Sequence, residues 1–168
     1  MKTLFRIVLY LALIVWLGAE IFFPVVATVT FRTLQSDTRT AGAVVGHLVG
    51  ILHGMGLTSG GVALVLLALA PVWGIYKPRT VLAPIGLLAV MIGLTVYSQK
   101  GIIPAMERDR IAIAGAIDAS DAANSSSADF EKLHHRSVYV EETILLLGLA
   151  TVVFVAKAET TRPERTGL

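Results

Sequence analysis

The sequence predicts an all-α integral membrane protein, built as a bundle of four helices. Four apolar stretches are each long enough, or nearly long enough, to cross a bilayer, for which about 20 apolar residues suffice. Of the 168 residues, 55% are hydrophobic and 15% are charged, whereas about a quarter of the residues of a soluble domain are charged. Most of the charges lie outside the apolar stretches. The length indicates one domain, residues 1–168.

The first apolar stretch runs from Ile7 to Phe31, between Arg6 and Arg32. Lys2 and Arg6 resemble the basic region of a signal peptide. The apolar stretch is too long for such a peptide, and no convincing cleavage site of small residues follows it. We therefore expect an uncleaved span at about residues 5–31.

The second apolar stretch, Ala41 to Tyr76, is longer than a bilayer requires. As a single helix its roughly 36 residues would measure ~54 Å. Two interpretations remain open: the first part of the helix projects beyond the membrane, or Ser59-Gly60-Gly61 breaks it. We place the span at about residues 44–76, followed by a short turn at 77–79.

The third span is expected at about residues 81–100, and its helix can continue through Pro104 to Asp118. Pro104 would kink that helix, because proline has no N–H. The charged run from Met106 to Arg110 does not suit lipid. We therefore expect residues 104–136 to form a polar segment outside the membrane, with a loop from Ser120 to Asp129.

The fourth span is expected at about residues 138–157, in a helix that begins near Phe130 with Asp129 or Ser127 as its N-cap. Its apolar stretch, 143–156, has only 14 residues. The span must therefore include residues 138–140, which draws Glu141 and Glu142 towards the membrane boundary. Helices two to four would then extend past the bilayer on the side opposite the termini.

Four spans place both termini on one side of the membrane. The basic residues in the short loops and span flanks determine orientation, and seven of them lie on this side: Lys2, Arg6, Lys77, Arg79, Lys157, Arg162 and Arg165. The opposite side has as many basic residues, but most of them lie in a long loop that also carries acidic residues. We expect the termini to be cytoplasmic.

Several classes of function have no support in the sequence. The absence of cysteine excludes disulfides, thiolate metal sites and cysteine nucleophiles. The sequence has no basic cluster interleaved with aromatic residues, so nothing in it suggests nucleic-acid binding. No GxSxG, phosphate-loop or HExxH motif is present. We therefore expect a protein that is not an enzyme.

The ionisable residues of the spans gather on one side of the predicted bundle. Such residues are costly in a membrane and usually face the bundle interior or a cavity. The topology places seven of them in the half opposite the termini: Glu20, His47, His53, His134, His135, Glu141 and Glu142. We therefore expect any functional site in that half.

Glu20 and two histidines are the first candidates. Glu20 shares a helical stripe with Trp16 and Pro24, and can act as a proton relay or cation ligand, or simply bond a neighbouring helix. His47 and His53 are six residues apart, so they do not form an i, i+4 chelating pair. A haem or metal site would need a second helix, and interhelical hydrogen bonding is the alternative.

A second group lies on the last helix, where His134, Ser137 and Glu141 share one face. A histidine and a carboxylate two turns apart can form a ligand with its supporting hydrogen bond, or a proton pair. The alternative is a hydrogen-bond network that fixes helix register. We take His47, His53 and His134 as candidate cofactor ligands and Glu20, His134 and Glu141 as candidate metal ligands. Haem or a transition metal is the cofactor to consider, although none is the default.

Gly42, Gly46, Gly50 and Gly54 recur every four residues. Such stripes of small residues let helix backbones approach closely in membranes. We expect tight helix packing within the bundle. The alternatives are a subunit interface or a groove that admits a flat ligand.

The pattern F-x-x-L-H-x-x-S-x-x-x-E runs from Phe130 to Glu141. It resembles the late motif of the transmembrane protein 205-like family, whose bacterial members are a domain of unknown function. Trp16-Leu17-Gly18 with the following Phe22-Phe23, and Met106-Glu107-Arg108, also resemble that family. Glu141 stands where the family pattern has Asn, so a carboxylate could change the role of that position. The resemblance implies four helices in a bacterial inner membrane and no established activity.

Three functions follow as hypotheses. The first is an accessory or interaction subunit of a membrane complex, which contacts the lipid bilayer and other membrane subunits or a second copy of itself. The second is a haem- or metal-binding membrane protein. The third is a small proton-coupled transporter centred on Glu20 and Glu141, although no inverted repeat supports it.

Overall fold

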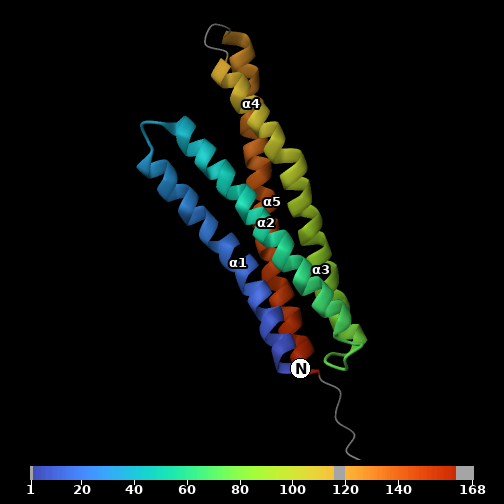
Figure 1. Ribbon diagram of the computed structural model, residues 1–168. Helices are drawn as coiled ribbons and strands as arrows, with labels where there is room; N and C mark the ends of the chain where they lie inside the picture. Colours follow the sequence, from blue (N-terminus) through green and yellow to red (C-terminus); the bar gives the residue numbers. More distant parts are fainter. Residues whose placement is uncertain (1, 116–119, 162–168) are drawn as a thin grey trace, which may run out of the picture.

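In the computed structural model, residues 2–115 and 120–161 are described, and they form a bundle of long helices (Figure 1). The helices are α1 (Lys2–Thr33), α2 (Thr38–Leu69), α3 (Pro78–Tyr97), α4 (Ile103–Gly115) and α5 (Ser120–Thr160). A π-helix, η1 (Ser98–Ile102), joins α3 to α4 without a break. Four helical segments are long and apolar enough to cross a membrane. The predicted four-helix membrane bundle is confirmed.

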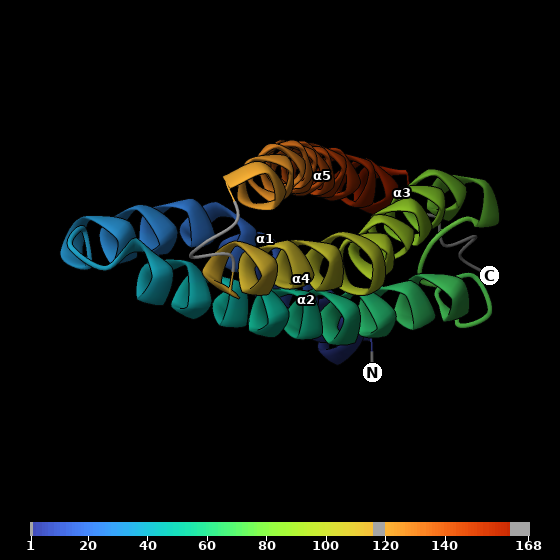
Figure 2. The same ribbon diagram turned by 90° about the horizontal axis from the view of Figure 1, so that it is seen from above.

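The bundle consists of two hairpins. Helix α1 packs against α2, the segment α3–η1–α4 packs against α5, and contacts between α2 and α3 join the hairpins. The N-terminus, the α2–α3 turn and the end of α5 lie at one end (Figure 1). At the other end the α1–α2 turn lies well apart from the start of α5 (Figure 2). The molecule is therefore closely packed near the termini and open at the opposite end.

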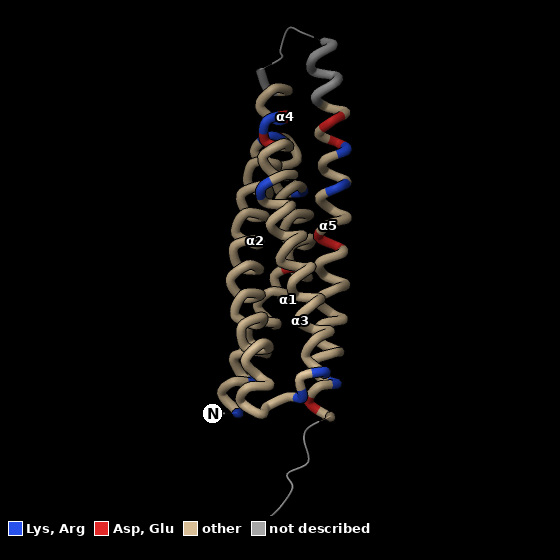
Figure 3. The backbone as a smooth tube through the Cα atoms, turned by 90° about the vertical axis from the view of Figure 1, so that its right-hand side faces the viewer, with Lys and Arg blue, Asp and Glu red and all other residues tan. Residues whose placement is uncertain are grey.

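Charged residues concentrate towards the two ends of the bundle, and the middle is almost free of them (Figure 3). This distribution suits helices that cross a hydrocarbon layer about 30 Å thick. Helix α5, with 41 residues, is ~60 Å long. Its length therefore leaves about half of it outside such a layer.

Helix α2 continues through Ser59-Gly60-Gly61, so the predicted alternative of a break there is wrong. The helix begins after Asp37, whose carboxylate accepts hydrogen bonds from the Thr40 N–H (2.9 Å) and hydroxyl (2.5 Å). These bonds hold the pKa of Asp37 below its usual value.

Helix α2 ends at Leu69, seven residues earlier than the apolar pattern predicts. Pro71 follows closely, and Gly74 adopts φ +60°, a left-handed conformation that glycine adopts readily. The apolar residues 70–76 therefore form a turn, in which Ile75 and Tyr76 are buried and Val72 and Trp73 are exposed. Hydropathy alone does not distinguish such a turn from a helix.

The predicted continuation of the third helix to Pro104 and beyond is confirmed as far as Gly115, and its predicted end at Asp118 lies outside the described residues. Just before Pro104 the helix widens into η1, where the Ile103 N–H bonds the Ser98 carbonyl. Proline has no N–H with which to continue the i→i−4 hydrogen bonds of an α-helix. The irregularity next to Pro104 is thus a π-turn.

The predicted loop from Ser120 to Asp129 is wrong, because α5 begins at Ser120. Asp129 and Ser127 consequently lie inside the helix and do not cap it. Three alanines, which favour helix most strongly, lie among the polar residues 120–129, and α4 packs alongside α5. A polar composition indicated a loop, but the antiparallel neighbour supports a helix.

The core near the termini depends on Trp16. A Cβ added at Gly60 would overlap its indole ring, and one added at Gly56 would lie 2.7 Å from the indole Nε1. The two glycines therefore form a notch in α2 that only the absence of side chains allows. A Cβ at Gly148 of α5 would similarly overlap Leu17.

At the terminal end, polar contacts tie three segments together. Arg6 of α1 forms an ion pair with Glu159 of α5 at 3.1 Å. The hydroxyl of Tyr76, in the α2–α3 turn, donates to the same carboxylate at 2.5 Å. Phe5 packs edge-on against both Trp73 and Tyr76.

The expected tight packing of Gly42, Gly46, Gly50 and Gly54 within the bundle is not found. A Cβ at any of the four would have no atom of the described chain within 4 Å. The divergence of the hairpins leaves this part of α2 uncovered. The close contacts fall instead on Gly56 and Gly60, and the alternatives of a subunit interface or a groove remain for the predicted stripe.

Replacing Gly60 by Ala should destabilise the fold by about 1–3 kcal/mol, the usual cost of overpacking a core. Gly61→Ala is the matched control, because its Cβ meets no atom within 4 Å in the described chain. Alanine should even stabilise the helix there, by about 0.5–1 kcal/mol. Thermal unfolding in detergent measures both. Equal stability of the two variants would contradict the notch.

Candidate functional site

A cleft of about 450 Å³ opens between the two hairpins at the end opposite the termini. Helices α1 and α2 form one wall, which is mostly apolar, and α4 and α5 form the other, which carries most of the polar groups. The lining residues of α1 and α2 are Glu20, Pro24, Ala27, Thr28, Phe31, Gly42, Val45, Gly46 and Val49.

Glu20 lies at the inner end of the cleft, next to the packed core. It is 5% exposed, and its Oε1 accepts a hydrogen bond from the Trp16 Nε1–H at 3.1 Å. The two residues are one helical turn apart, so this bond needs no second helix. The indole that fills the glycine notch thus also fixes the direction of the carboxylate.

His53 and Glu141 form a buried pair that joins the hairpins. The ring Nε2 of His53, on α2, lies 2.8 Å from Glu141 Oε1, on α5. Ser98 of η1 donates to the same oxygen at 3.1 Å. The His53 side chain is 1% exposed, so the pair is shielded from solvent on the histidine side.

The second ring nitrogen of His53, Nδ1, lies 2.7 Å from Gln99 Oε1. With this arrangement both ring nitrogens donate, which is the imidazolium form facing a carboxylate. A neutral ring needs the Gln99 amide turned, so that its NH₂ donates to Nδ1. In either form the Nε2–H points at Glu141.

Glu141 contributes one oxygen that has no donor. Its Oε2 is buried and has no hydrogen-bond partner among the described residues, while the residue lines the cleft. An unsatisfied buried polar group costs about 1–3 kcal/mol. A hydrogen-bond donor at the inner end of the cleft would satisfy it.

The π-helix η1 supplies two of these contacts, through Ser98 and Gln99. Single π-turns in long helices are frequent at functional sites. The sequence analysis missed both residues. Their signal was modest: two polar residues at the end of an apolar run, shortly before Pro104.

The rim of the cleft is more exposed. His134 is exposed and stacks parallel on Phe130, with ring centroids 6.4 Å apart. Arg110 of α4 forms an ion pair with Glu107 at 2.7 Å, and Glu142 lines the rim from α5. His135 lies elsewhere and pairs with Glu131 at 3.1 Å.

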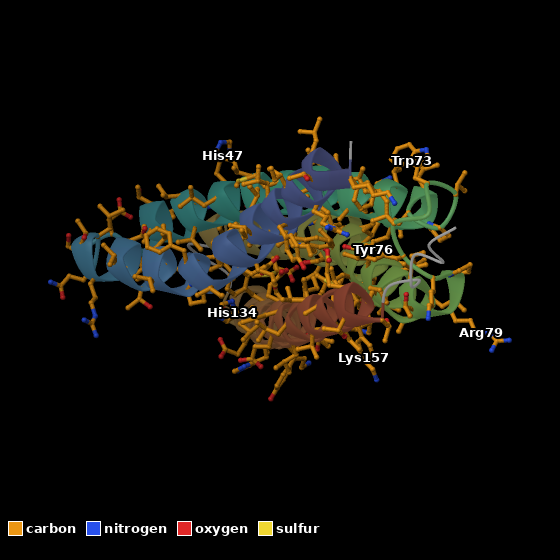
Figure 4. All side chains as sticks on the ribbon, turned by 90° about the horizontal axis from the view of Figure 1, so that it is seen from below. His47, Trp73, Tyr76, Arg79, His134 and Lys157 are labelled. Atoms are coloured by element: carbon orange, nitrogen blue, oxygen red, sulfur yellow. The ribbon has the colours of Figure 1, made fainter. Side chains whose placement is uncertain are left out.

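The structure brings some of the predicted site residues together and separates others. Glu20, His134 and Glu141 all line the cleft, and His53 lies behind Glu141. His47 is exposed and points away from the bundle (Figure 4). The histidines proposed as cofactor ligands therefore do not converge on one point.

The geometry offers no ligand set for a metal or haem. Among the described residues, no group of three or more His, Asp or Glu is close enough to hold a metal ion. Both ring nitrogens of His53 already face oxygen atoms. Ligation would require this pair to separate, so the arrangement is better described as a buried histidine–carboxylate hydrogen bond beside a cleft.

A family described as a domain of unknown function (DUF4149) matches residues 11–110. The match spans most of α1, all of α2, α3 and η1, and half of α4. It includes Glu20, His53 and Gln99, and ends before α5 and Glu141. No curated protein and no solved structure matches the chain.

Removing the Glu141 carboxylate should destabilise the protein, because the Nε2–H of His53 loses its acceptor. We expect Glu141→Ala to cost about 1–3 kcal/mol, the penalty of an unsatisfied buried donor. Glu142→Ala, at the exposed neighbouring position, should change stability by less than about 0.5 kcal/mol. Chemical unfolding in detergent compares them, and an equal effect would show that the pair does not join the hairpins.

Proposed function

The chain belongs to the DUF4149 family of domains of unknown function, and from this premise we propose that it is an accessory or interaction subunit of a membrane complex, with no catalysis of its own. Its partner is another membrane protein or a second copy of the chain. The four glycines of α2 carry this proposal.

Gly42, Gly46, Gly50 and Gly54 lie along an i, i+4 row, which is the commonest ridge or groove in helix packing. A Cβ at each would meet no atom of the described chain within 4 Å. In a bilayer, rows of small residues let a second helix approach closely, and van der Waals packing stabilises the contact. The row therefore suits a helix from outside this chain.

The same proposal includes a setting in the bacterial inner membrane, with the termini in the cytoplasm. The basic residues at the terminal end of the bundle support this orientation. The resemblance of the motif from Phe130 to Glu141 to the transmembrane protein 205-like family supports the bacterial setting. Residues 104–115 of the third helical segment and 120–136 at the start of α5 then project on the periplasmic side.

The orientation has a direct test, because the chain contains no cysteine. Single cysteines at Lys77, in the α2–α3 turn, and at Asp129, in the outer part of α5, should report opposite sides. A membrane-impermeant maleimide should label Asp129→Cys in intact spheroplasts. It should label Lys77→Cys only after lysis. The reverse pattern would invert the proposed orientation.

The subunit proposal predicts that a side chain in the glycine row weakens association. Gly50→Leu should cost about 1–3 kcal/mol of packing energy, which is about 5–150-fold in an association constant. Gly93→Leu, on α3, is the control, since its Cβ also meets no atom of the described chain within 4 Å. Crosslinking in the native membrane, followed by mass determination, measures the complex.

Two results would contradict the proposal. One is a wild-type protein that is monomeric and lacks a stoichiometric partner. The other is a complex that Gly50→Leu and Gly93→Leu weaken equally, since a specific contact on α2 would not respond to a change on α3.

A further inference from the structure

The cleft between the hairpins has the size and the division of polarity of a ligand site. Its volume, about 450 Å³, lies within the range of about 300–1,000 Å³ that is usual for small-molecule pockets. Pro24, Phe31, Val45 and Val49 make one wall apolar. The inner end holds carboxylates. A molecule with an apolar tail and a polar head matches this division.

The charges favour a cationic head. Four glutamates line the cleft, at positions 20, 107, 141 and 142, against the single Arg110. Arg110 is engaged by Glu107 at the rim. At the inner end His53 faces only Oε1 of Glu141, and Glu20 lines the cleft without a basic residue bonded to it in the described chain. A carboxylate or phosphate head would be repelled there.

The hydrogen bonds indicate what kind of cation fits. Oε2 of Glu141 is buried and has no donor in the described chain, so the head must donate. A primary ammonium has three N–H donors and can serve both glutamates. A metal ion such as Ca²⁺ needs 6–8 oxygen ligands, whereas the carboxylates of Glu20 and Glu141 have four oxygens between them. An ammonium therefore fits the available acceptors better.

We propose that this cleft binds an amphipathic primary amine, with its ammonium between Glu20 and Glu141 and its hydrocarbon tail along the α1–α2 wall. The site goes beyond the proposed subunit function and does not depend on it. Binding would satisfy the one buried carboxylate oxygen that the fold leaves without a donor.

Trp16 provides the readout, because its indole donates to Glu20. The chain has two tryptophans, and the other, Trp73, lies at the opposite end of the bundle. Trp73→Phe therefore makes Trp16 the sole tryptophan, which is excited selectively at wavelengths that tyrosine does not absorb. This protein, in nanodiscs of uncharged phosphatidylcholine, is titrated with octylammonium, octanol and octanoate, which share a tail and differ in the head group.

Octylammonium should give a saturable change in Trp16 emission, and the other two probes should not. Glu141→Gln should weaken the response roughly tenfold or more, the loss expected for a charge-assisted hydrogen bond. Glu131→Gln, at an exposed position of the same helix outside the cleft, should leave it unchanged. If Glu141→Gln does not fold, Glu20→Gln carries the same test, because it removes the charge and keeps an acceptor for the indole.

The proposal is overturned if octylammonium gives no saturable response, or if octanol and octanoate give the same one. It is also overturned if the glutamine variants at positions 20 and 141 bind octylammonium as well as the wild type. A wild-type protein that forms no complex but still binds octylammonium would refute the subunit function and leave the ligand site standing.

Discussion

The contact of Trp16 with the glycine notch of α2 is the constraint on which the rest of the structure depends. Because Gly56 and Gly60 have no side chains, the indole lies against the α2 backbone and brings α1 close to it. The same ring donates to Glu20, so core packing and the direction of the carboxylate are set by one residue. Above this level the hairpins diverge, and Glu20 becomes the innermost α1 residue of the cleft.

The notch holds α1 to α2 within one hairpin, whereas the polar pair of His53 and Glu141 joins the two hairpins. Burying two charges costs desolvation energy, so such a pair rarely adds much stability compared with apolar residues of the same size. The pair instead orients the two side chains, because two residues of η1 contact them. Ser98 donates a hydrogen bond to the carboxylate, and Gln99 contacts the imidazole ring. These bonds fix the register of α2, η1 and α5, and they leave Oε2 of Glu141 buried without a donor among the described residues.

Hydropathy and charge spacing predicted the four helices, the common side of the termini and the half of the bundle where the polar residues meet. Local exceptions were not predictable in this way. The turn at 70–77 is as apolar as a span, and the start of α5 is as polar as a loop, so each was assigned to the wrong class.

Glu20, His134 and Glu141 were identified because ionisable residues in spans are conspicuous. Gln99 was missed because its role depends on a π-turn, which has no periodicity of its own. His53 and Glu141 are 88 residues apart in the sequence. Their pairing depends on how α2 and α5 pack together, which the residue spacing within either helix does not encode.

The open glycine row and the cleft have a common origin in the divergence of the hairpins. Gly42 and Gly46 line the cleft, whereas Gly54 faces a groove on the α1–α2 hairpin with Val8 and Val15. The row thus passes from the cleft to the outer surface as it follows α2.

A helix packed along the glycine row would reach the edge of the cleft, where it would contact or restrict a ligand bound inside. Thermodynamic linkage then requires a reciprocal effect: a ligand in the cleft changes the affinity for the partner by the same factor by which the partner changes the affinity for the ligand. One helix, α2, carries the notch for Trp16, the histidine of the buried pair and the open row, so a displacement of α2 would affect all three.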